Sequence, residues 1–127
     1  MATSVRSAPG KGRLIGSWVI RILLAVAFLG AGGAKHAGVP MMVQVFDQIG
    51  LGQGFRYVTA AVEICGAIAL FIPVLTGLAA LGLGVTMFFA LLAHLFILHT
   101  SPVGAVVLMV LSFALAWLHR DRIVPLR

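Results

Sequence analysis

The chain has 127 residues, of which 61% are hydrophobic and only 9% are charged, whereas a typical soluble domain has about 25% charged residues. Its mean hydropathy is +1.14 and its net charge at pH 7 is +6. This composition excludes a disordered chain, a small secreted module stapled by disulfides, and a nucleic-acid-binding domain with an ordinary soluble core. We therefore expect one small membrane domain, with the lipid bilayer as a partner and no nucleic acid.

Four windows are apolar and long enough to cross a bilayer, whose hydrocarbon core of about 30 Å requires about 20 residues of helix. They are residues 14–34, 57–76, 77–98 and 102–119, which leaves residues 1–13 and 120–127 as basic tails. The first window also resembles a cleaved signal peptide, because it follows basic residues and ends in small ones. However, Arg21 interrupts its apolar run and three further spans follow. We therefore expect four membrane helices.

The basic residues outside these windows are unevenly placed. Three lie in each tail, two flank the first loop, and the other two loops have none. Because Lys and Arg are enriched on the cytoplasmic side of membrane proteins, this distribution predicts that both termini are cytoplasmic and that the first loop is outside. An even number of spans agrees with that topology.

The first loop, from His36 to Arg56, is long enough to have its own structure. Apolar residues recur at helical spacing between Pro40 and Ile49, and Gly50 can end a helix there. We expect a short amphipathic helix that either lies on the membrane surface or caps the other helices. The remaining connections are tight, which makes neighbouring spans antiparallel. The predicted fold class is therefore all-α, an integral membrane four-helix bundle with a short amphipathic helix in the first outer loop.

Small residues and one arginine indicate which side of the first window contacts other helices. Ala27 with Ala31 and Gly30 with Ala34 have the spacing at which helix backbones approach closely in membranes. Residues 21, 25, 28, 32 and 35 form one stripe, which should face the other helices. Arg21 in this stripe would extend towards the inner interface.

Ionisable side chains inside a bilayer are energetically expensive, so each is a candidate for function. Glu63 lies about 9 Å below the outer end of the second window at 1.5 Å per residue, and its helical neighbours are small. Lys35, at the outer end of the first window, has a side chain long enough to reach it. We expect an ion pair, which either fixes the register of two helices or acts as a proton site.

Three histidines belong to the same outer half. His94 lies late in the third window, at a depth similar to that of Glu63, whereas His36 and His99 mark the outer ends of two windows. With Lys35 they complete a candidate ligand-binding pocket, in which Glu63 and His94 are the candidate catalytic residues. His94 can instead make a packing hydrogen bond, and His36 and His99 can be interfacial anchors. We expect no metal site, because no two of these residues have the i, i+4 spacing of helical metal ligands.

Five short motifs occur in a characteristic order. They are Arg21 opening the first span, Gly32-Gly33-Ala34-Lys35 closing it, Pro40 with Phe46 and Ile49-Gly50-Leu51 in the outer loop, Glu63-Ile-Cys-Gly66 in the second span, and Ala90-Leu-Leu-Ala-His94 in the third. In this order, and with four spans, the chain resembles the DoxX family of small bacterial membrane proteins. The motifs cover most of the chain after the N-terminal tail.

The resemblance implies a location in the bacterial inner membrane and a role in quinone- or thiol-linked redox chemistry, as a membrane subunit or accessory of an oxidoreductase. By the same resemblance, Lys35, Glu63 and His94 would line a site for a quinone head group, with no covalently bound cofactor. Cys65 is the only cysteine, which excludes a dithiol relay within this chain. The expected partner is therefore a membrane or extracytoplasmic redox protein, and a homo-oligomer is also compatible with the sequence.

Two other functions remain open at this point. A non-catalytic membrane scaffold would use the same fold to hold a partner subunit. A small proton-coupled exporter would also need four spans and one membrane glutamate, but exporters that insert in both orientations have nearly balanced Lys and Arg, unlike this chain.

Overall fold

The computed structural model describes residues 11–123, and every regular element within them is a helix, which confirms the all-α prediction for this part of the chain. Four helices are long and three elements are short. In chain order they are α2 (Lys11–Ala37), α3 (Pro40–Ile49), α4 (Gln53–Ala69), α5 (Thr76–Ala93), the π-helical turn η1 (His94–Leu98), α6 (Val103–Leu118) and α7 (Arg120–Ile123).

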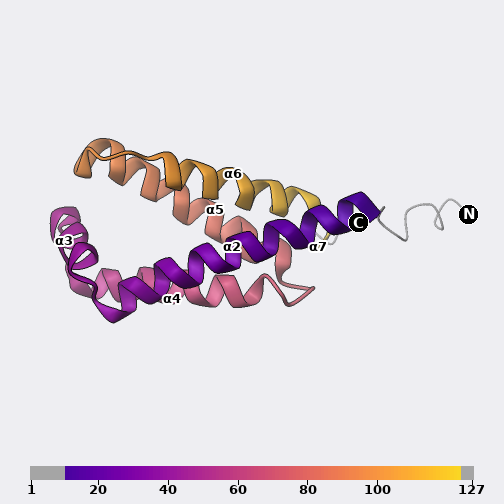
Figure 1. Cartoon of the computed structure of the whole chain (residues 1–127), viewed down its shortest axis with the longest axis horizontal. Helices are drawn as coiled ribbons and strands as arrows, with labels where there is room; N and C mark the ends of the chain where they lie inside the picture. The colour runs from indigo at the N-terminus through magenta and orange to yellow at the C-terminus, as the bar shows by residue number, and fades with distance from the viewer. Residues whose placement is uncertain (1–10, 124–127) are drawn as a thin grey trace, which may run out of the picture.

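The long helices pack as two antiparallel pairs. α2 lies along α4, and α5 lies along α6 (Figure 1), while contacts of α2 with α6 and of α4 with α5 join the two pairs. The pairs diverge towards one end of the molecule, where α3 lies across the gap and contacts α4, η1 and α2. The start of α2 and the end of α6 lie at the opposite end. The fold therefore has a closed end, where the described chain begins and finishes, and a splayed end covered by α3.

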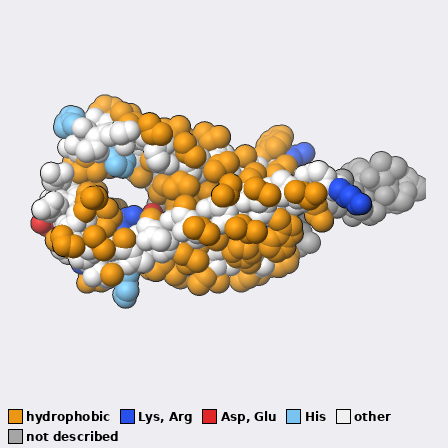
Figure 2. Space-filling view, viewed as in Figure 1, with side chains coloured by type: hydrophobic (Ala, Val, Ile, Leu, Met, Phe, Trp, Pro, Cys, Tyr) orange, Lys and Arg blue, Asp and Glu red, His pale blue; other side chains and the backbone are white. Residues whose placement is uncertain are grey.

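Two helical segments, Lys11–Ala37 and Thr76–Leu98, are long and apolar enough to cross a membrane by the criteria of length and composition. α6 is also apolar but has 16 residues. Large hydrophobic side chains are exposed along all four long helices, and Figure 2 shows them covering most of the face in view. A continuous apolar exterior of this kind is suited to contact with lipid.

The helix boundaries differ most from the predicted windows at the second window, residues 57–76. α4 begins earlier, at Gln53, directly after Gly52 in a left-handed conformation with φ 91°, and it ends at Ala69. Turns follow, and the Thr76 hydroxyl donates to the carbonyl oxygens of Leu70 (2.9 Å) and Ile72 (3.1 Å). The windows 57–76 and 77–98 put this connection a few residues too late, because the turn residues are as apolar as the helices that they join.

The other windows agree more closely with the helices. α2 extends the first window, 14–34, into the predicted tail 1–13, of which residues 1–10 lie outside the described residues. The third window, 77–98, corresponds to α5 with η1, and the fourth, 102–119, corresponds to α6. Of the predicted tail 120–127, the segment Arg120–Ile123 is helical, and residues 124–127 lie outside the described part.

The short helix predicted in the first loop is confirmed. α3 begins with Pro40 in its first turn and ends at Gly50, whose φ of 84° is left-handed and whose N–H donates to the Phe46 carbonyl. Phe46 is its buried residue, and its ring lies against that of Phe55, with 5.8 Å between the centroids. The polar residues Gln44, Asp47 and Gln48 are exposed. α3 is therefore an amphipathic cap on the splayed end.

Close contact between α2 and α4 occurs at Gly32, which belongs to the predicted buried stripe, and not at Gly30, which was predicted from small-residue spacing. Nothing lies within 4 Å of a Cβ built on Gly30, whereas a Cβ on Gly32 would lie 2.7 Å from Ile64 Cγ1 and 3.2 Å from the Ala60 carbonyl oxygen. Because one of these atoms belongs to the backbone, the conflict cannot be relieved by a side-chain rotation alone. At Gly32, α4 therefore packs directly against the backbone of α2.

We predict that Gly32→Ala lowers the free energy of unfolding by about 1–3 kcal/mol, the usual cost of overpacking a filled site. The matched control is Gly33→Ala in the same helix, since nothing lies within 4 Å of its Cβ position. That change should stabilise the helix slightly, because alanine has the better helix propensity. Thermal unfolding in detergent, followed by circular dichroism, measures both. Equal effects of the two substitutions would contradict this packing.

Candidate functional site

A pocket of about 710 Å³ lies beneath α3, between the two helix pairs. Its walls come from α2, α3, α4, α5, η1 and α6, and most of its lining side chains are apolar. Figure 2 shows the hollow beside the splayed end, with basic and acidic side-chain atoms visible inside it. The polar and charged residues that line it are Lys35, Thr59, Glu63, Thr86 and His94.

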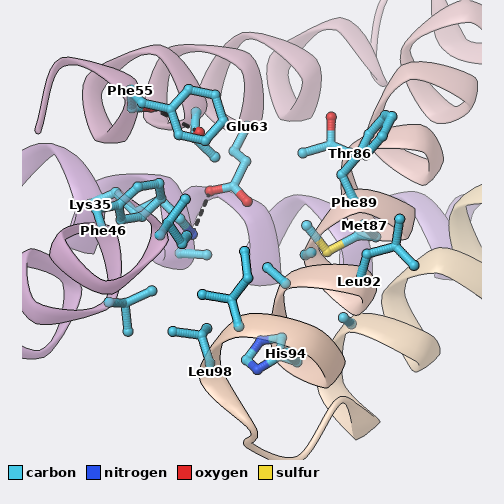
Figure 3. Close-up of a pocket in the computed structure, with 18 of the residues that line it drawn as sticks. Lys35, Phe46, Phe55, Glu63, Thr86, Met87, Phe89, Leu92, His94 and Leu98 are labelled. Atoms are coloured by element: carbon cyan, nitrogen blue, oxygen red, sulfur yellow. Dashed lines mark hydrogen bonds and ion pairs between the residues drawn. The ribbon is translucent and has the colours of Figure 1, made fainter. Parts of the chain in front are cut away.

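The ion pair predicted between Lys35 and Glu63 is present, since Lys35 Nζ lies 3.0 Å from Glu63 Oε1. Glu63 is only 1% exposed, and the Lys35 side chain is 15% exposed. Figure 3 shows the two side chains pointing towards one another from α4 and α2. At this separation the lysine ammonium satisfies the buried carboxylate both by charge and by hydrogen-bond distance.

Lys35 and Glu63 come together because small residues surround them. Glu63 Cβ would be 3.3 Å from a Cβ on Gly32, and Gly32 lies on the same face of α2 as Lys35, three residues away. Ala60 and Ala67, on the buried face of α4, are also small. The backbones therefore approach closely enough for the lysine stem to lie along α4 and bring its ammonium to the carboxylate.

His94 lines the same pocket from the other helix pair. It begins η1, and its Nδ1 lies 2.6 Å from Thr100 Oγ1. Figure 3 shows its ring on the side of the pocket opposite Glu63. Thr100 fixes the orientation of the imidazole, and Nε2 is then the ring nitrogen that is left for another contact. The structure thus brings Lys35, Glu63 and His94 to one pocket.

His36 and His99, the other predicted ligand-binding residues, are not part of the pocket lining. Both are exposed. The His36 ring packs edge-on against Tyr57 with 5.9 Å between centroids, and His99 adopts a left-handed conformation with φ 52° directly after η1. His36 belongs to the last turn of α2 but is on an exposed face, whereas His99 follows η1 and its side chain is directed by the turn. Their positions in the sequence correctly predicted that both histidines lie at the splayed end. They did not predict that the two side chains point away from the pocket.

Arg56 organises the splayed end and was not singled out by its sequence context. It is 5% exposed, its Nη1 donates to the Lys35 carbonyl oxygen, and its Nε donates to Gln53 Oε1 at 2.7 Å. Gln53 Nε2 in turn donates to the Val43 carbonyl oxygen (3.0 Å) and to Asp47 Oδ1 (2.8 Å). Arg56 thereby ties the end of α2 to α4, and Gln53 ties α4 to α3. A cation near the carboxyl end of α2 also suits the helix dipole.

A second polar cluster lies at the opposite end of the molecule. Arg21 is 8% exposed, its Nε donates to Ser17 Oγ at 3.2 Å, and its Nη2 lies 3.3 Å from His119 Nε2. Ser17 Oγ and His119 Nε2 are 2.8 Å apart. The predicted stripe of α2 does face the other helices, because Arg21, Ala25, Phe28 and Gly32 are all buried. The Arg21 side chain extends towards the closed end, as predicted, and is held there by Ser17, one turn nearer the start of α2, and by His119, directly after α6.

The described part of the chain contains no group of three or more His, Cys, Asp or Glu side chains that could hold a metal ion. Cys65 is a free, exposed cysteine. The ionisable groups that line the pocket are one carboxylate, one ammonium and one imidazole, in a lining that is mostly apolar.

Comparison with known proteins gives two matches. The sequence model of the DoxX-like family matches residues 19–119. A Bacillus subtilis (strain 168) protein named "Putative oxidoreductase CatD" is 32% identical over 62 residues, which cover 49% of this chain and 46% of that protein. The aligned region thus spans less than half the length of that relative. No solved structure matches the chain significantly.

We predict that the ion pair is energetically coupled. Lys35→Met leaves the Glu63 carboxylate without its partner, and Glu63→Gln does the same to the Lys35 ammonium. Each single variant should lower the free energy of unfolding by about 3–5 kcal/mol, the range measured for broken buried pairs. The double variant should cost clearly less than the sum of the two, because it removes both groups. A double-mutant cycle on unfolding in detergent measures the difference. Strictly additive losses would show that the two side chains do not interact.

Proposed function

The chain belongs to the DoxX-like family, and from this membership and the geometry of the pocket we propose that it is an integral membrane four-helix bundle that binds a quinone head group. In this proposal it acts as a membrane subunit or accessory of quinone- or thiol-linked redox chemistry in the bacterial inner membrane. The observation that carries the proposal is a nearly fully buried carboxylate, paired with a lysine, in the wall of an otherwise apolar cavity.

The apolar exterior supports four membrane crossings. α2 and the α5–η1 segment meet the length criterion, and DoxX-like proteins are membrane-associated. α4, with 17 residues, and α6, with 16, would extend only about 24–26 Å at 1.5 Å per residue. Their exposed faces are nevertheless as apolar as those of the longer helices. In the apolar turn after α4, the N–H groups of Phe71, Ile72 and Leu75 and the Thr76 hydroxyl have partners within the segment. Because these polar groups are satisfied, the turn can also lie in the hydrocarbon, and all four long helices can reach across a bilayer.

The distribution of charge favours cytoplasmic termini. Lys11, Arg13 and Arg120 lie at the closed end of the molecule and are exposed. The two cations of the splayed end are both engaged within the protein, Lys35 with Glu63 and Arg56 with the Lys35 carbonyl and Gln53. Exposed Lys and Arg are retained on the cytoplasmic side. The closed end is therefore assigned to the cytoplasm, and the pocket and α3 to the outer half.

The pocket suits a compact ligand with hydrogen-bonding oxygens. Its volume lies in the range of roughly 300–1,000 Å³ that is usual for small-molecule sites, and only five of its lining residues are polar. Lys35 and His94 can each donate a hydrogen bond to a carbonyl oxygen of a quinone, and Glu63 can exchange a proton with it. When bound, a quinone would supply the electron-accepting chemistry, and the residues of this chain would position it and carry the proton.

The electrons would come from a partner protein. One cysteine cannot form a dithiol within the chain, which leaves this protein an accessory part in any thiol oxidation. The similarity to a protein named as an oxidoreductase fits a redox setting. A scaffold without a ligand is the competing function, because the Lys35–Glu63 pair also locks α2 to α4.

We predict that purified protein binds decyl-ubiquinone and that Glu63→Gln or His94→Ala weakens this binding at least tenfold, about 1.4 kcal/mol. Each substitution removes a polar group from the pocket wall. The matched control is His99→Ala, which removes an exposed histidine outside the pocket and should leave the affinity unchanged. Equilibrium titration, with circular dichroism to verify folding, measures all four proteins. If the wild type binds no quinone, or if both folded pocket variants bind as the wild type does, the scaffold function takes its place.

We also predict the topology. A cysteine introduced at Gln48, on the exposed face of α3, should react with a membrane-impermeant maleimide added to intact cells, whereas a cysteine at Asp121 should react only after the cells are opened. Both belong in a Cys65→Ser background, since Cys65 is exposed. The reverse labelling pattern would place the pocket in the cytoplasmic half.

A further inference from the structure

The pocket opens to the side of the helix assembly. At the splayed end it is roofed by α3, which contributes Met42, Val45, Phe46 and Ile49 to its lining. Figure 1 shows the two helix pairs diverging beneath this roof, and Figure 2 shows the resulting hollow in the flank of the molecule, between the pairs. In a membrane-spanning protein the flank faces lipid. A ligand can therefore reach the pocket from the bilayer without moving α3.

The exposed residues of the pocket lining are all large and apolar. They come from both sides of the gap between the helix pairs and from the loop after α3. Phe55, Val58 and Val62 of α4, Phe89 of α5, Phe96 and Ile97 of η1, and Leu51 are all between 39% and 72% exposed. We call this set the rim. A path along the rim leads from the pocket to the outer surface of the helices through apolar contacts alone.

The charged groups lie at the inner end of that path. Glu63 is 1% exposed, Lys35 is 15% exposed, and no residue of the rim carries a charge. A water-soluble ligand would gain nothing from such a rim, because apolar surface offers its polar groups no partner. A ligand with a polar head and an apolar tail matches both parts, since each segment of it meets a surface of its own kind.

We propose that the pocket takes an amphiphile from the bilayer, with its compact polar head at the Lys35–Glu63 pair and its linear apolar tail passing over the rim into the surrounding lipid. This inference rests on the proposed function. It adds that the ligand carries an apolar tail and that it enters the pocket sideways from the bilayer. The tail stays in apolar surroundings throughout, so only the head is transferred to the protein. The route explains why the apolar side chains of the pocket extend outwards to the exterior instead of closing around a cavity.

The experiment compares one quinone head with and without a decyl tail, in protein with a bulky side chain on the rim. Val62→Trp and Val58→Trp each place an indole on the path of the tail. The matched control is Val85→Trp on α5, because Val85 and Val62 are both 43% exposed and Val85 is not part of the pocket lining. Affinities are measured in detergent micelles, and each variant is compared with the wild type for the same ligand, so that partitioning into the micelle cancels.

We expect a rim tryptophan to weaken binding of the decyl quinone at least tenfold, to change binding of the tailless head by less than threefold, and in the control to change neither. Equal loss of both ligands, or unchanged binding of both, in the two rim variants would overturn the lateral route while leaving the quinone site intact. Failure of the wild type to bind either ligand would overturn the proposed function and this inference with it. A change of oligomeric state in the rim variants, measured by light scattering, would show that a second copy of the chain occupies the gap, and would also overturn the inference.

Discussion

A carboxylate that is withdrawn from solvent inside an apolar protein needs a positive partner, because an unpaired buried charge costs several kcal/mol. Glu63 has that partner in Lys35 across the α2–α4 contact. The pairing is feasible because Gly32 lets the two backbones approach within reach of a lysine stem. A second contact reinforces it near the start of α4, where Arg56 donates a hydrogen bond to the backbone carbonyl of Lys35. α2 and α4 are thus joined by an ion pair and by a hydrogen bond to the backbone. Together they form one wall of the molecule, against which α5 and α6 pack.

Much of this fold could be predicted from residue types. Hydropathy and turn residues located the helices, Pro40 and Gly50 marked the ends of α3, and the bilayer's penalty for charge singled out Lys35, Glu63 and His94. Side-chain direction could be predicted only within a regular helix, where periodicity fixes it. His99 follows η1 in a left-handed conformation, so its direction did not follow from helical spacing. Arg56 was also missed, because the sequence does not show that its long side chain folds back on the end of α2.

The two ends of the molecule treat buried cations in different ways. At the closed end, the Arg21 guanidinium is held by Ser17 and His119 and stacks over the Trp18 ring, 4.5 Å from its centroid. At the splayed end, Lys35 has a carboxylate, and Arg56 is shared among a carbonyl, an amide and the Tyr57 ring. The splayed end is the one that combines a carboxylate with open space.

The π-helical turn at residues 94–98 determines how much of the third long helix the pocket can use. A π turn contains about one residue more than an α turn, so the chain advances around the helix axis more slowly there. Leu92 and Ala93 at the end of α5 line the cavity, and so do His94, Phe96, Ile97 and Leu98 of the π turn. In evolutionary terms the turn is equivalent to a single inserted residue. Loss of one residue from this segment would restore regular winding and rotate the aromatic and aliphatic side chains after it away from the cavity, even if every remaining residue were retained. The length of the chain at this position is therefore as much a determinant of the binding site as the identity of its amino acids.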